Sequence, residues 1–366
     1  MNISRKVSVL SAFGALLAFL ASSAAVFSQD AIKTTPGDFV IKDYKFESGE
    51  TIPELKIHYV TLGTPQKDKN GQVTNAVIIN HGTGGSNTQF LSRSFAGILF
   101  GKGQLLDSDK YFIIIPDNIG HGASSKPSNG LHAKFPHYCY HDMIDTQYRL
   151  LTEKLGVNHL RLVMGTSMGG MHSWLWAETY PDFMDAAMPL ASLPVEIAGR
   201  NRYFRRMVID PIQNDPDWMN GEYKTQPVRG LTTALYTLIV MGTAPLQMQK
   251  TMPTKAAADA AFDATMKQRL ATTDANDMLY QFDASRDYNP EPKLESIKTH
   301  LLAINSADDA VNPPELGIAE KQIKRVKNGR FILLPITDET RGHGTHTIPA
   351  IWGKYLGDLL AETERK

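Results

Sequence analysis

Residues 160–180 read LRLVMGTSMGGMHSWLWAETY, and this stretch indicates the architecture more clearly than any other part of the chain. An apolar run at 160–164 predicts a buried strand, and the apolar pattern at 171–180 predicts a helix. Between them stands the pattern G-x-S-x-G, centred on Ser167. A serine on so sharp a turn needs neighbours without a Cβ atom, and the following helix N-terminus favours developing negative charge. We therefore expect Ser167 to be a nucleophile.

Short apolar runs alternate with helix-like segments along the chain, which predicts an α/β protein with a mostly parallel sheet and helices on both faces. Two early runs, 39–46 and 55–62, predict an antiparallel hairpin at the sheet edge. From 194 to 292 the pattern is helical, so we expect a helical cap there, inserted into a core of 29–193 and 293–366. The core strands are expected at 76–80, 111–116, 160–164, 186–191, 301–305 and 331–334.

The N-terminus has the pattern of an export signal. A basic pair at 5–6 precedes an uncharged, largely apolar stretch at 7–20, and small residues follow. The apolar stretch has about 14 residues, short of the roughly 20 that cross a bilayer. We expect residues 1–28 to be a signal peptide cleaved after Ser28, with Ala25 as the competing site and an uncleaved anchor as the alternative. The mature chain would be periplasmic or secreted, without stable membrane insertion.

Composition excludes several classes of function. Lys plus Arg number 38 and Asp plus Glu number 38, so no net basic field exists to bind nucleic acid. Removing residues 1–28 would leave a net charge of −2. Cys139 is the single cysteine, which excludes an internal disulfide and a C-x-x-C metal or redox site.

One cluster offers an alternative chemistry, because it contains ligand types that zinc prefers. Its spacing puts no clear pair of ligands on one helix face, and Asp142 has the position of an N-cap before a helix at 143–155. We therefore expect no metal and no cofactor. The cluster consists of His132, His137, Cys139, His141 and Asp142.

A nucleophilic serine needs oxyanion donors beside it. The loop after the strand expected at 76–80 reads HGTGG, and its glycines let backbone N–H groups point at a substrate oxygen. It lacks the Lys-Ser/Thr ending of a phosphate-binding loop. We expect the N–H groups of Thr83 and Met168 to form the oxyanion hole. His81 would buttress the loop, and His172 would belong to the core.

The serine also needs a base and an acid, and the loops after the last two expected strands hold the candidates. Asp308 and Asp309 follow the first of these strands, and His343 and His346 follow the second. Both loops open on the sheet edge where α/β proteins build their sites. The residues alone leave each pair open.

Four separated motifs then follow one order along the chain: the strand and loop at 75–81, D-x-x-G-x-G-x-S-x-x-P at 117–127, the turn at 165–171 and D-P-x-W-x-x-G-x-Y at 215–223. Together they resemble the α/β-hydrolase superfamily and, within it, the homoserine O-acetyltransferase-like group. The resemblance implies an α/β-hydrolase fold over nearly the whole mature chain and a small-molecule acyl or ester substrate. A homodimer is compatible with it.

The resemblance also distinguishes the two candidate pairs. In this group the acid stands four residues before a proline pair and the base follows a glycine, which implies Asp309 and His343. Ser167 would attack an acyl carbonyl, His343 would move the proton, and Asp309 would orient the imidazole.

Three functions fit these residues: a serine hydrolase, an acyltransferase of the homoserine O-acetyltransferase type, and a non-catalytic binding protein. We expect the hydrolase, because export would separate the chain from cytoplasmic acetyl-CoA. Gly344 also stands where the resemblance places a substrate-binding aspartate, and Ile209 where it places an arginine for the substrate carboxylate. Arg205 or Arg206 could supply that arginine if the helix register shifts.

Overall fold

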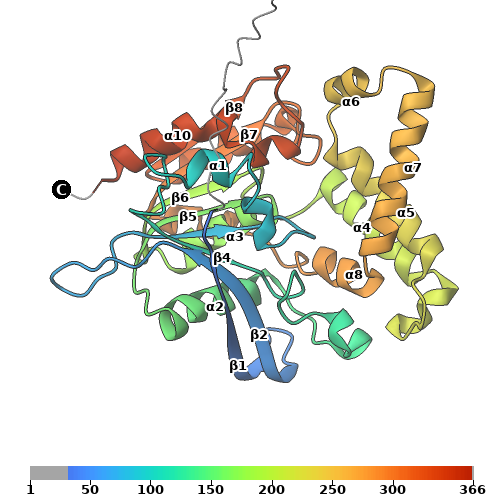
Figure 1. Cartoon of the computed structure of the whole chain (residues 1–366), viewed down its shortest axis with the longest axis horizontal. Helices are drawn as coiled ribbons and strands as arrows, with labels where there is room; N and C mark the ends of the chain where they lie inside the picture. The colour runs from blue at the N-terminus through green and yellow to red at the C-terminus, as the bar shows by residue number, and fades with distance from the viewer. Residues whose placement is uncertain (1–31, 365–366) are drawn as a thin grey trace, which may run out of the picture. The chain divides into compact units, whose positions relative to one another are not determined.

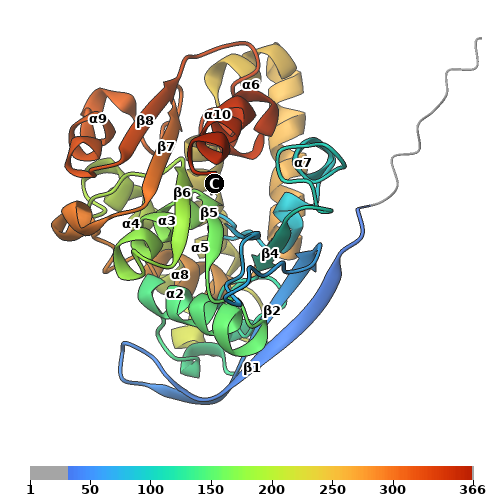
Figure 2. The ribbon, with the colours of Figure 1, turned by 90° about the vertical axis from the view of Figure 1, so that its left-hand side faces the viewer.

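The computed structural model describes residues 32–364, so the predicted signal peptide lies outside the described residues. Eight strands form one sheet in the order β1-β2-β4-β3-β5-β6-β7-β8, and β3 to β8 are parallel (Figures 1 and 2). The predicted α/β architecture is confirmed. The strands are β1 (Thr35–Lys45), β2 (Thr51–Leu62), β3 (Ala76–Asn80), β4 (Phe112–Pro116), β5 (Leu160–Thr166), β6 (Met184–Leu190), β7 (His300–Ser306) and β8 (Gly329–Leu334).

The first two strands form the expected antiparallel hairpin, a long ribbon at the sheet edge in Figure 2. Strand β2 also pairs antiparallel with β4, which joins the hairpin to the parallel part. The central strands are short and apolar because both of their faces are covered. Every residue of β3 and β4 is buried.

Helices supply the two covers. Helices α2 (Tyr140–Arg149) and α3 (Met168–Thr179) pack on one face, and α1 (Ala96–Leu99) and α10 (Pro349–Glu362) on the other. Side chains of β3 alternate between the two apolar clusters, because successive residues of a strand point to opposite faces.

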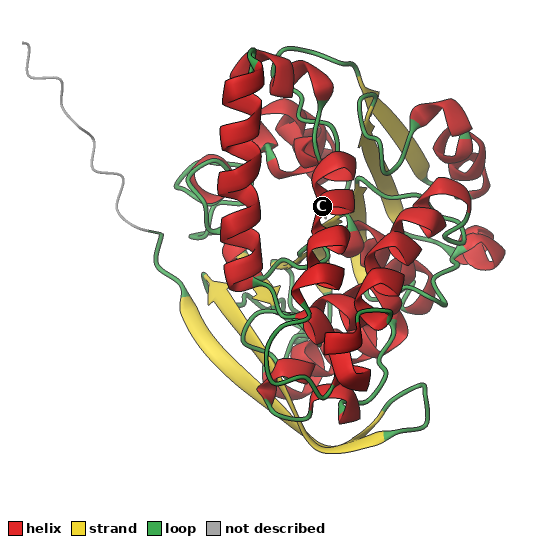
Figure 3. Cartoon of the chain, turned by 90° about the vertical axis from the view of Figure 1, so that its right-hand side faces the viewer, coloured by secondary structure: helices red, strands yellow, loops and turns green. Residues whose placement is uncertain are grey.

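The segment between β6 and β7 contains only helices among its regular elements, as Figures 1 and 3 show. Helix α4 packs on α5 and α8, and α5 packs on α7. Strands β6 and β7 are nevertheless neighbours, with Leu190 opposite Ile304. The sheet is therefore continuous across the insertion. Its helices are α4 (Gly199–Gln213), α5 (Val228–Gly242), α6 (Pro245–Thr251), α7 (Lys255–Thr272) and α8 (Ala275–Asp283); α9 (Ile318–Gln322) follows β7.

One helix start differs from the sequence prediction. Helix α2 begins at Tyr140, and its N-cap is Cys139, not Asp142. The Asp142 carboxylate instead lies in the first turn and accepts the Cys139 N–H at 2.8 Å. A carboxylate at the third position of a helix can accept the N–H of the N-cap residue, so it stabilises the helix start from inside the helix. The helix therefore begins three residues before the predicted start at 143.

Among the described residues no single helix is long and apolar enough to cross a membrane. Helices α5 and α6 together meet that length and composition test, but they are bent by 100° where they join.

Candidate active site

Ser167 stands on the turn between β5 and α3. Its backbone has φ 57° and ψ −112°, a conformation that residues with a side chain rarely adopt. The turn is held because the Ser167 N–H donates to the Leu190 carbonyl at 2.9 Å and its own carbonyl accepts from Met171 in α3. Backbone strain of this kind persists only where the surrounding structure fixes it, and it gathers at functional sites.

The three glycines around Ser167 have no room for a side chain. A Cβ atom on Gly165 would lie 2.3 Å from the Gly169 carbonyl oxygen, and one on Gly169 would lie 1.9 Å from the carbonyl oxygen of Asn80. A Cβ atom on Gly170 would lie 2.3 Å from the Leu190 carbonyl oxygen. The turn can therefore press against the neighbouring strands only with glycine at these positions.

A chain of hydrogen bonds leads from Ser167 into the protein. The Nε2 atom of His343 lies 2.8 Å from Ser167 Oγ, and its Nδ1 atom lies 2.9 Å from Asp309 Oδ2. The Asp309 carboxylate accepts from Nδ1–H, which leaves Nε2 to accept the serine proton. The structure thus brings Ser167 together with the base and the acid that the resemblance implies.

Asp309 is held in place by its own loop. Its Oδ1 atom accepts the N–H groups of Val311 and Asn312 at 2.8 and 3.2 Å, and its Oδ2 atom accepts the Asn312 side-chain amide at 3.0 Å. Burial alone would raise the pKa of Asp309, but the charge and hydrogen bond of His343 and the Asn312 donor lower it below its usual value. The carboxyl therefore stays ionised, as an orienting acid requires.

Asp308, the competing acid, points to the other side of the same loop. Its Oδ2 atom accepts the Gly342 N–H at 2.9 Å, and its Oδ1 atom accepts the Ser306 hydroxyl at 2.5 Å. Asp308 therefore connects the loop after β7 (the acid loop, residues 307–313) to Gly342, the residue that precedes His343, and it does not bond to the imidazole.

His346, the competing base, is half-buried beside His343, with the two rings 4.9 Å apart. Burial, together with the neighbouring imidazole, lowers the pKa of His346 to about 3. The neutral His346 ring packs beside His343 without adding a second charge. It does not contact Ser167.

The oxyanion loop lies against the nucleophile turn. Gln89 joins the two, because its Oε1 atom accepts the Gly82 N–H at 3.2 Å and its Nε2 atom donates to Thr166 Oγ1 at 2.8 Å. Within residues 32–364, no atom accepts a hydrogen bond from the backbone N–H of Thr83 or of Met168, the first residue of α3. Both N–H groups are therefore available as donors to an oxyanion, which is the role expected for them from the sequence.

His81 supports this loop from below. Its Nδ1 atom donates to the Gly82 carbonyl at 2.8 Å, and its Nε2 atom accepts the Asn118 N–H at 3.1 Å. Asn118 in turn accepts from Gln147, whose amide nitrogen also lies 3.2 Å from His172 Nδ1. Burial lowers the pKa of both histidines, that of His172 to about 3, so the support is uncharged.

Sequence reasoning missed Gln89, Asn118 and Gln147. Each is an amide whose partners are far away in sequence: Gln89 and Thr166, for example, are 77 positions apart. Asn118 lies in the motif at 117–127, but at a position that the motif leaves open, so the motif gives no signal for its role.

The helical insertion contributes one buried cation near the site. Arg205 is 3% exposed, and its guanidinium donates to Asn201 Oδ1 at 3.1 Å and Ser285 Oγ at 2.8 Å. No carboxylate among the described residues pairs with it. Arg206, by contrast, is exposed and pairs with Asp210.

The cluster considered as a zinc site is dispersed. His137 pairs with Glu50 at 3.2 Å, and Cys139 caps α2. In the part of the chain that the structure describes, no three His, Cys, Asp or Glu side chains converge as metal ligands.

The site contains the groups that acyl transfer to a serine requires. Ser167 is hydrogen-bonded to a base, the base is hydrogen-bonded to an ionised carboxylate, and two N–H donors without an acceptor among the described residues lie beside the serine. The same parts serve hydrolysis and transfer to an alcohol, which differ only in what attacks the acyl-enzyme.

Known proteins that are similar to this chain include acyltransferases and an esterase. A family model described as alpha/beta hydrolase fold matches residues 75–335. A probable acyltransferase of Methanothermobacter thermautotrophicus is 32% identical over 279 residues, covering 76% of this chain and 84% of that protein. A homoserine O-acetyltransferase of Haemophilus influenzae is 31% identical over 285 residues, covering 70% and 77%. Among solved structures, the acetyl esterase MekB has a TM-score of 0.78 at 25% identity, covering 89% of this chain and 97% of MekB.

Proposed function

The chain belongs to the α/β-hydrolase fold family, and from that premise we propose that it is an exported serine hydrolase that cleaves an ester or related acyl bond. The observation that carries the proposal is the hydrogen-bonded chain from Ser167 through His343 to Asp309, beside the free N–H groups of Thr83 and Met168.

In the acylation step, Ser167 Oγ attacks the acyl carbonyl and its proton passes to His343 Nε2. The resulting imidazolium keeps its Nδ1–H bond to Asp309, whose ionised carboxylate stabilises the added charge. The carbonyl oxygen becomes an oxyanion and is received by the N–H groups of Thr83 and Met168. His343 then gives its proton to the leaving alcohol, and the acyl group stays on Ser167.

Deacylation repeats these steps with water in place of the serine. His343 takes a proton from water, the hydroxide attacks the acyl-enzyme, and the same two N–H groups receive the oxyanion. The proton returns to Ser167 as the acid departs.

The experiment is covalent labelling with a fluorophosphonate, followed by turnover of short-chain p-nitrophenyl esters. Labelling and turnover should both be present in the protein and absent in Ser167→Ala. Labelling without any turnover of esters of several chain lengths would contradict hydrolysis, and no labelling would contradict the serine mechanism.

Export rests on the leader at 1–28. Expression of the full chain in a Gram-negative host, followed by mass spectrometry of the periplasmic fraction, should give a mature N-terminus at Gln29. A full-length chain in the membrane fraction would contradict cleavage.

A second candidate function is acyl transfer to an acceptor that carries a carboxylate, and Arg205 is the observation that favours it. A buried guanidinium without a carboxylate partner suits a substrate carboxylate. Arg205 could therefore take the role of the arginine that the resemblance places at the position of Ile209, which is itself buried. Efficient formation of O-acetylhomoserine from acetyl-CoA and homoserine, with negligible ester cleavage, would favour transfer over hydrolysis. Arg205→Gln should then raise the KM for homoserine and leave ester cleavage nearly unchanged.

A further inference from the structure

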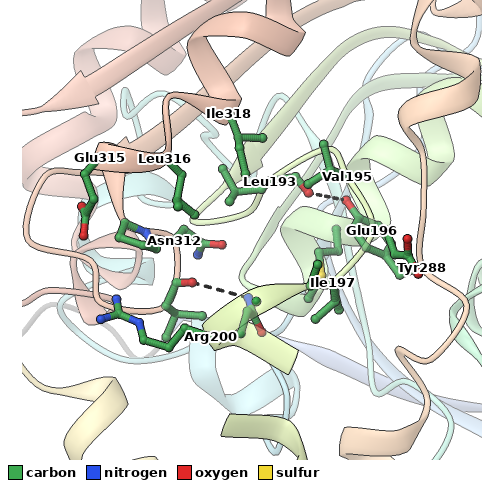
Figure 4. A pocket seen from close by; sticks show the side chains of 16 residues that line it. Leu193, Val195, Glu196, Ile197, Arg200, Tyr288, Asn312, Glu315, Leu316 and Ile318 are labelled. Atoms are coloured by element: carbon green, nitrogen blue, oxygen red, sulfur yellow. Dashed lines mark hydrogen bonds between the residues drawn. The ribbon is translucent and has the colours of Figure 1, made fainter. Parts of the chain in front are cut away.

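A cavity of about 380 Å³ lies beside the loop that follows Asp309 (Figure 4). Four parts of the chain line it: residues 193–201, which lead from β6 into α4, residues 311–318, which follow Asp309, Tyr288, and Met171 of α3. The residues that line it include neither Ser167 nor His343. It is therefore a space separate from the one where the acyl group would react.

Most of the side chains that line the cavity are apolar, and Tyr288 forms its buried inner end. The Tyr288 hydroxyl is already used, because it donates to the Leu193 carbonyl at 2.9 Å. A cavity of this size holds roughly a dozen non-hydrogen atoms at about 30 Å³ each, and an apolar wall with few polar groups is typical of small-molecule sites. The apolar side chains are Met171, Leu193, Val195, Ile197, Val311, Leu316 and Ile318.

Asn312 is the buried polar side chain in this wall, and one of its atoms is unused. Its amide nitrogen donates to the Ala191 carbonyl at 2.9 Å and to Asp309 Oδ2 at 3.0 Å. Both N–H groups are thereby satisfied, and no donor in residues 32–364 reaches the Oδ1 atom. An occupant with a hydrogen-bond donor would satisfy this oxygen.

The charges at the exposed rim disfavour an anionic occupant. Glu196 and Glu315 are both exposed there. The one cation, Arg200, already donates to the Ala310 carbonyl at 2.6 Å. Two carboxylates and one guanidinium leave the rim with a net charge of −1, which disfavours a carboxylate there.

We propose that this cavity binds a neutral aliphatic alcohol of about eight carbons, with its chain among the apolar side chains and its hydroxyl donating to Asn312 Oδ1. The product of ester cleavage is an alcohol of this chemical class.

Binding would act on the proposed reaction through Asn312, and this second part rests on the proposed function. A hydrogen bond accepted at Oδ1 makes the same amide a stronger donor to Asp309. Asp309 then offers less negative charge to the imidazolium that forms on His343. We expect kcat to fall about twofold with KM unchanged.

The binding test uses 1-octanol as the probe and Ser167→Ala as the protein, so that no acyl transfer occurs. Near-saturating 1-octanol should raise the Tm by about 1–2 °C, and ethanol at the same concentration should not. Ile197→Trp and Leu316→Trp fill the cavity and should lose the shift. Leu316 is 55% exposed, so that variant should fold even if Ile197→Trp does not. Ile336→Trp, at a 51% exposed apolar residue outside the lining, is the matched control and should keep the shift.

Several results would overturn the site: no shift with 1-octanol, a shift that persists in both filling variants, or a larger shift with octanoate. The kinetic arm uses p-nitrophenyl acetate and the unmodified protein. A rise in KM alone, or a change in rate that persists in Leu316→Trp, would place the alcohol at the reacting centre and overturn the coupling. Because binding is measured without turnover, its failure and the failure of the hydrolase proposal are separate results.

Discussion

The Nε2 atom of His343 lies 2.8 Å from Ser167 Oγ, although the two residues are 176 positions apart in sequence. The contact exists because β5 and β8 are parallel strands of one sheet, so the loops at their carboxyl ends open on the same edge. Replacing the serine tests both its chemistry and its strained backbone.

Ser167→Ala and Ser167→Gly should each lower kcat for a p-nitrophenyl ester by at least about 10⁴-fold, because no other hydroxyl contacts His343 Nε2 among the described residues. Their stabilities should differ. At φ 57° glycine is unstrained, so Ser167→Gly should be about 1 kcal/mol more stable than Ser167→Ala in urea unfolding. Equal stabilities would show that the turn is not strained.

His343→Ala and His346→Gln separate the two neighbouring histidines. His343→Ala should remove turnover, since it removes the base on Ser167. His346→Gln should retain at least about a tenth of kcat, because His346 is neutral and does not contact the serine. A loss of activity in His346→Gln with an unchanged Tm would assign the base to His346.

Asp309→Asn and Asp308→Asn exchange one oxygen for nitrogen in adjacent carboxylates. Asp309→Asn should lower kcat by about 10³–10⁴-fold, because it no longer accepts His343 Nδ1–H as an anion. Asp308→Asn weakens the bonds to the Gly342 N–H and the Ser306 hydroxyl, neither of which involves the imidazole, and should lower kcat by about tenfold or less. The reverse order would exchange the two roles.

Gln89→Leu should misplace the oxyanion loop, because Gln89 connects Gly82 to Thr166. We expect kcat to fall by about 10- to 100-fold with a small change in KM, since oxyanion contacts form mainly in the transition state.

The matched control is Gln104→Leu, which loses similar bonds to Gly101 and Gly97 outside the site. Both variants should be destabilised by about 1–2 kcal/mol. An equal loss of kcat in Gln104→Leu would mean that the effect of Gln89 is only one of stability.

Glu178 should make stability depend on pH. It lies in α3 and is 8% exposed, and burial raises its pKa from 4.5 to about 7 despite Lys293 nearby. A carboxyl with a raised pKa stabilises the fold while it is protonated, so this contribution is present below pH 4.5 and is lost as the pH rises through 7.

Urea unfolding of Glu178→Gln across pH 4–8 should therefore lose this decrease, and the variant should be more stable than the unmodified protein at pH 8. Glu222→Gln, at an exposed position, is the control and should leave the pH dependence unchanged. A decrease that persists in Glu178→Gln would assign it to another group.

Local patterns were enough to predict the strands and the nucleophile turn, because each depends on residues close together in sequence. The choice between Asp308 and Asp309 was different: two adjacent carboxylates have the same chemistry, and only the direction of the loop backbone separates them. The sequence resemblance selected Asp309, and its bonds to Val311 and Asn312 give the physical reason.

Gln89 could not be predicted in this way. Its role follows from the distance between Gly82 and Thr166, which only the packed sheet sets. The start of α2 was read wrongly for a related reason, because Asp142 carries the capping signal but does so from inside the helix.

The pairing of β6 with β7 across the helical insertion has a consequence for how such a protein changes over time. Because the two strands meet directly, the length of residues 199–296 can vary without altering the strand order, while contacts such as that of Arg200 with the Ala310 carbonyl connect the insertion to the loop that carries Asp309. The insertion supplies contacts such as those of Arg205, and the sheet supplies the chemistry. Exchange of these helices can therefore change the side chains that the insertion contributes, while the order of the strands that lead to Ser167, Asp309 and His343 stays the same.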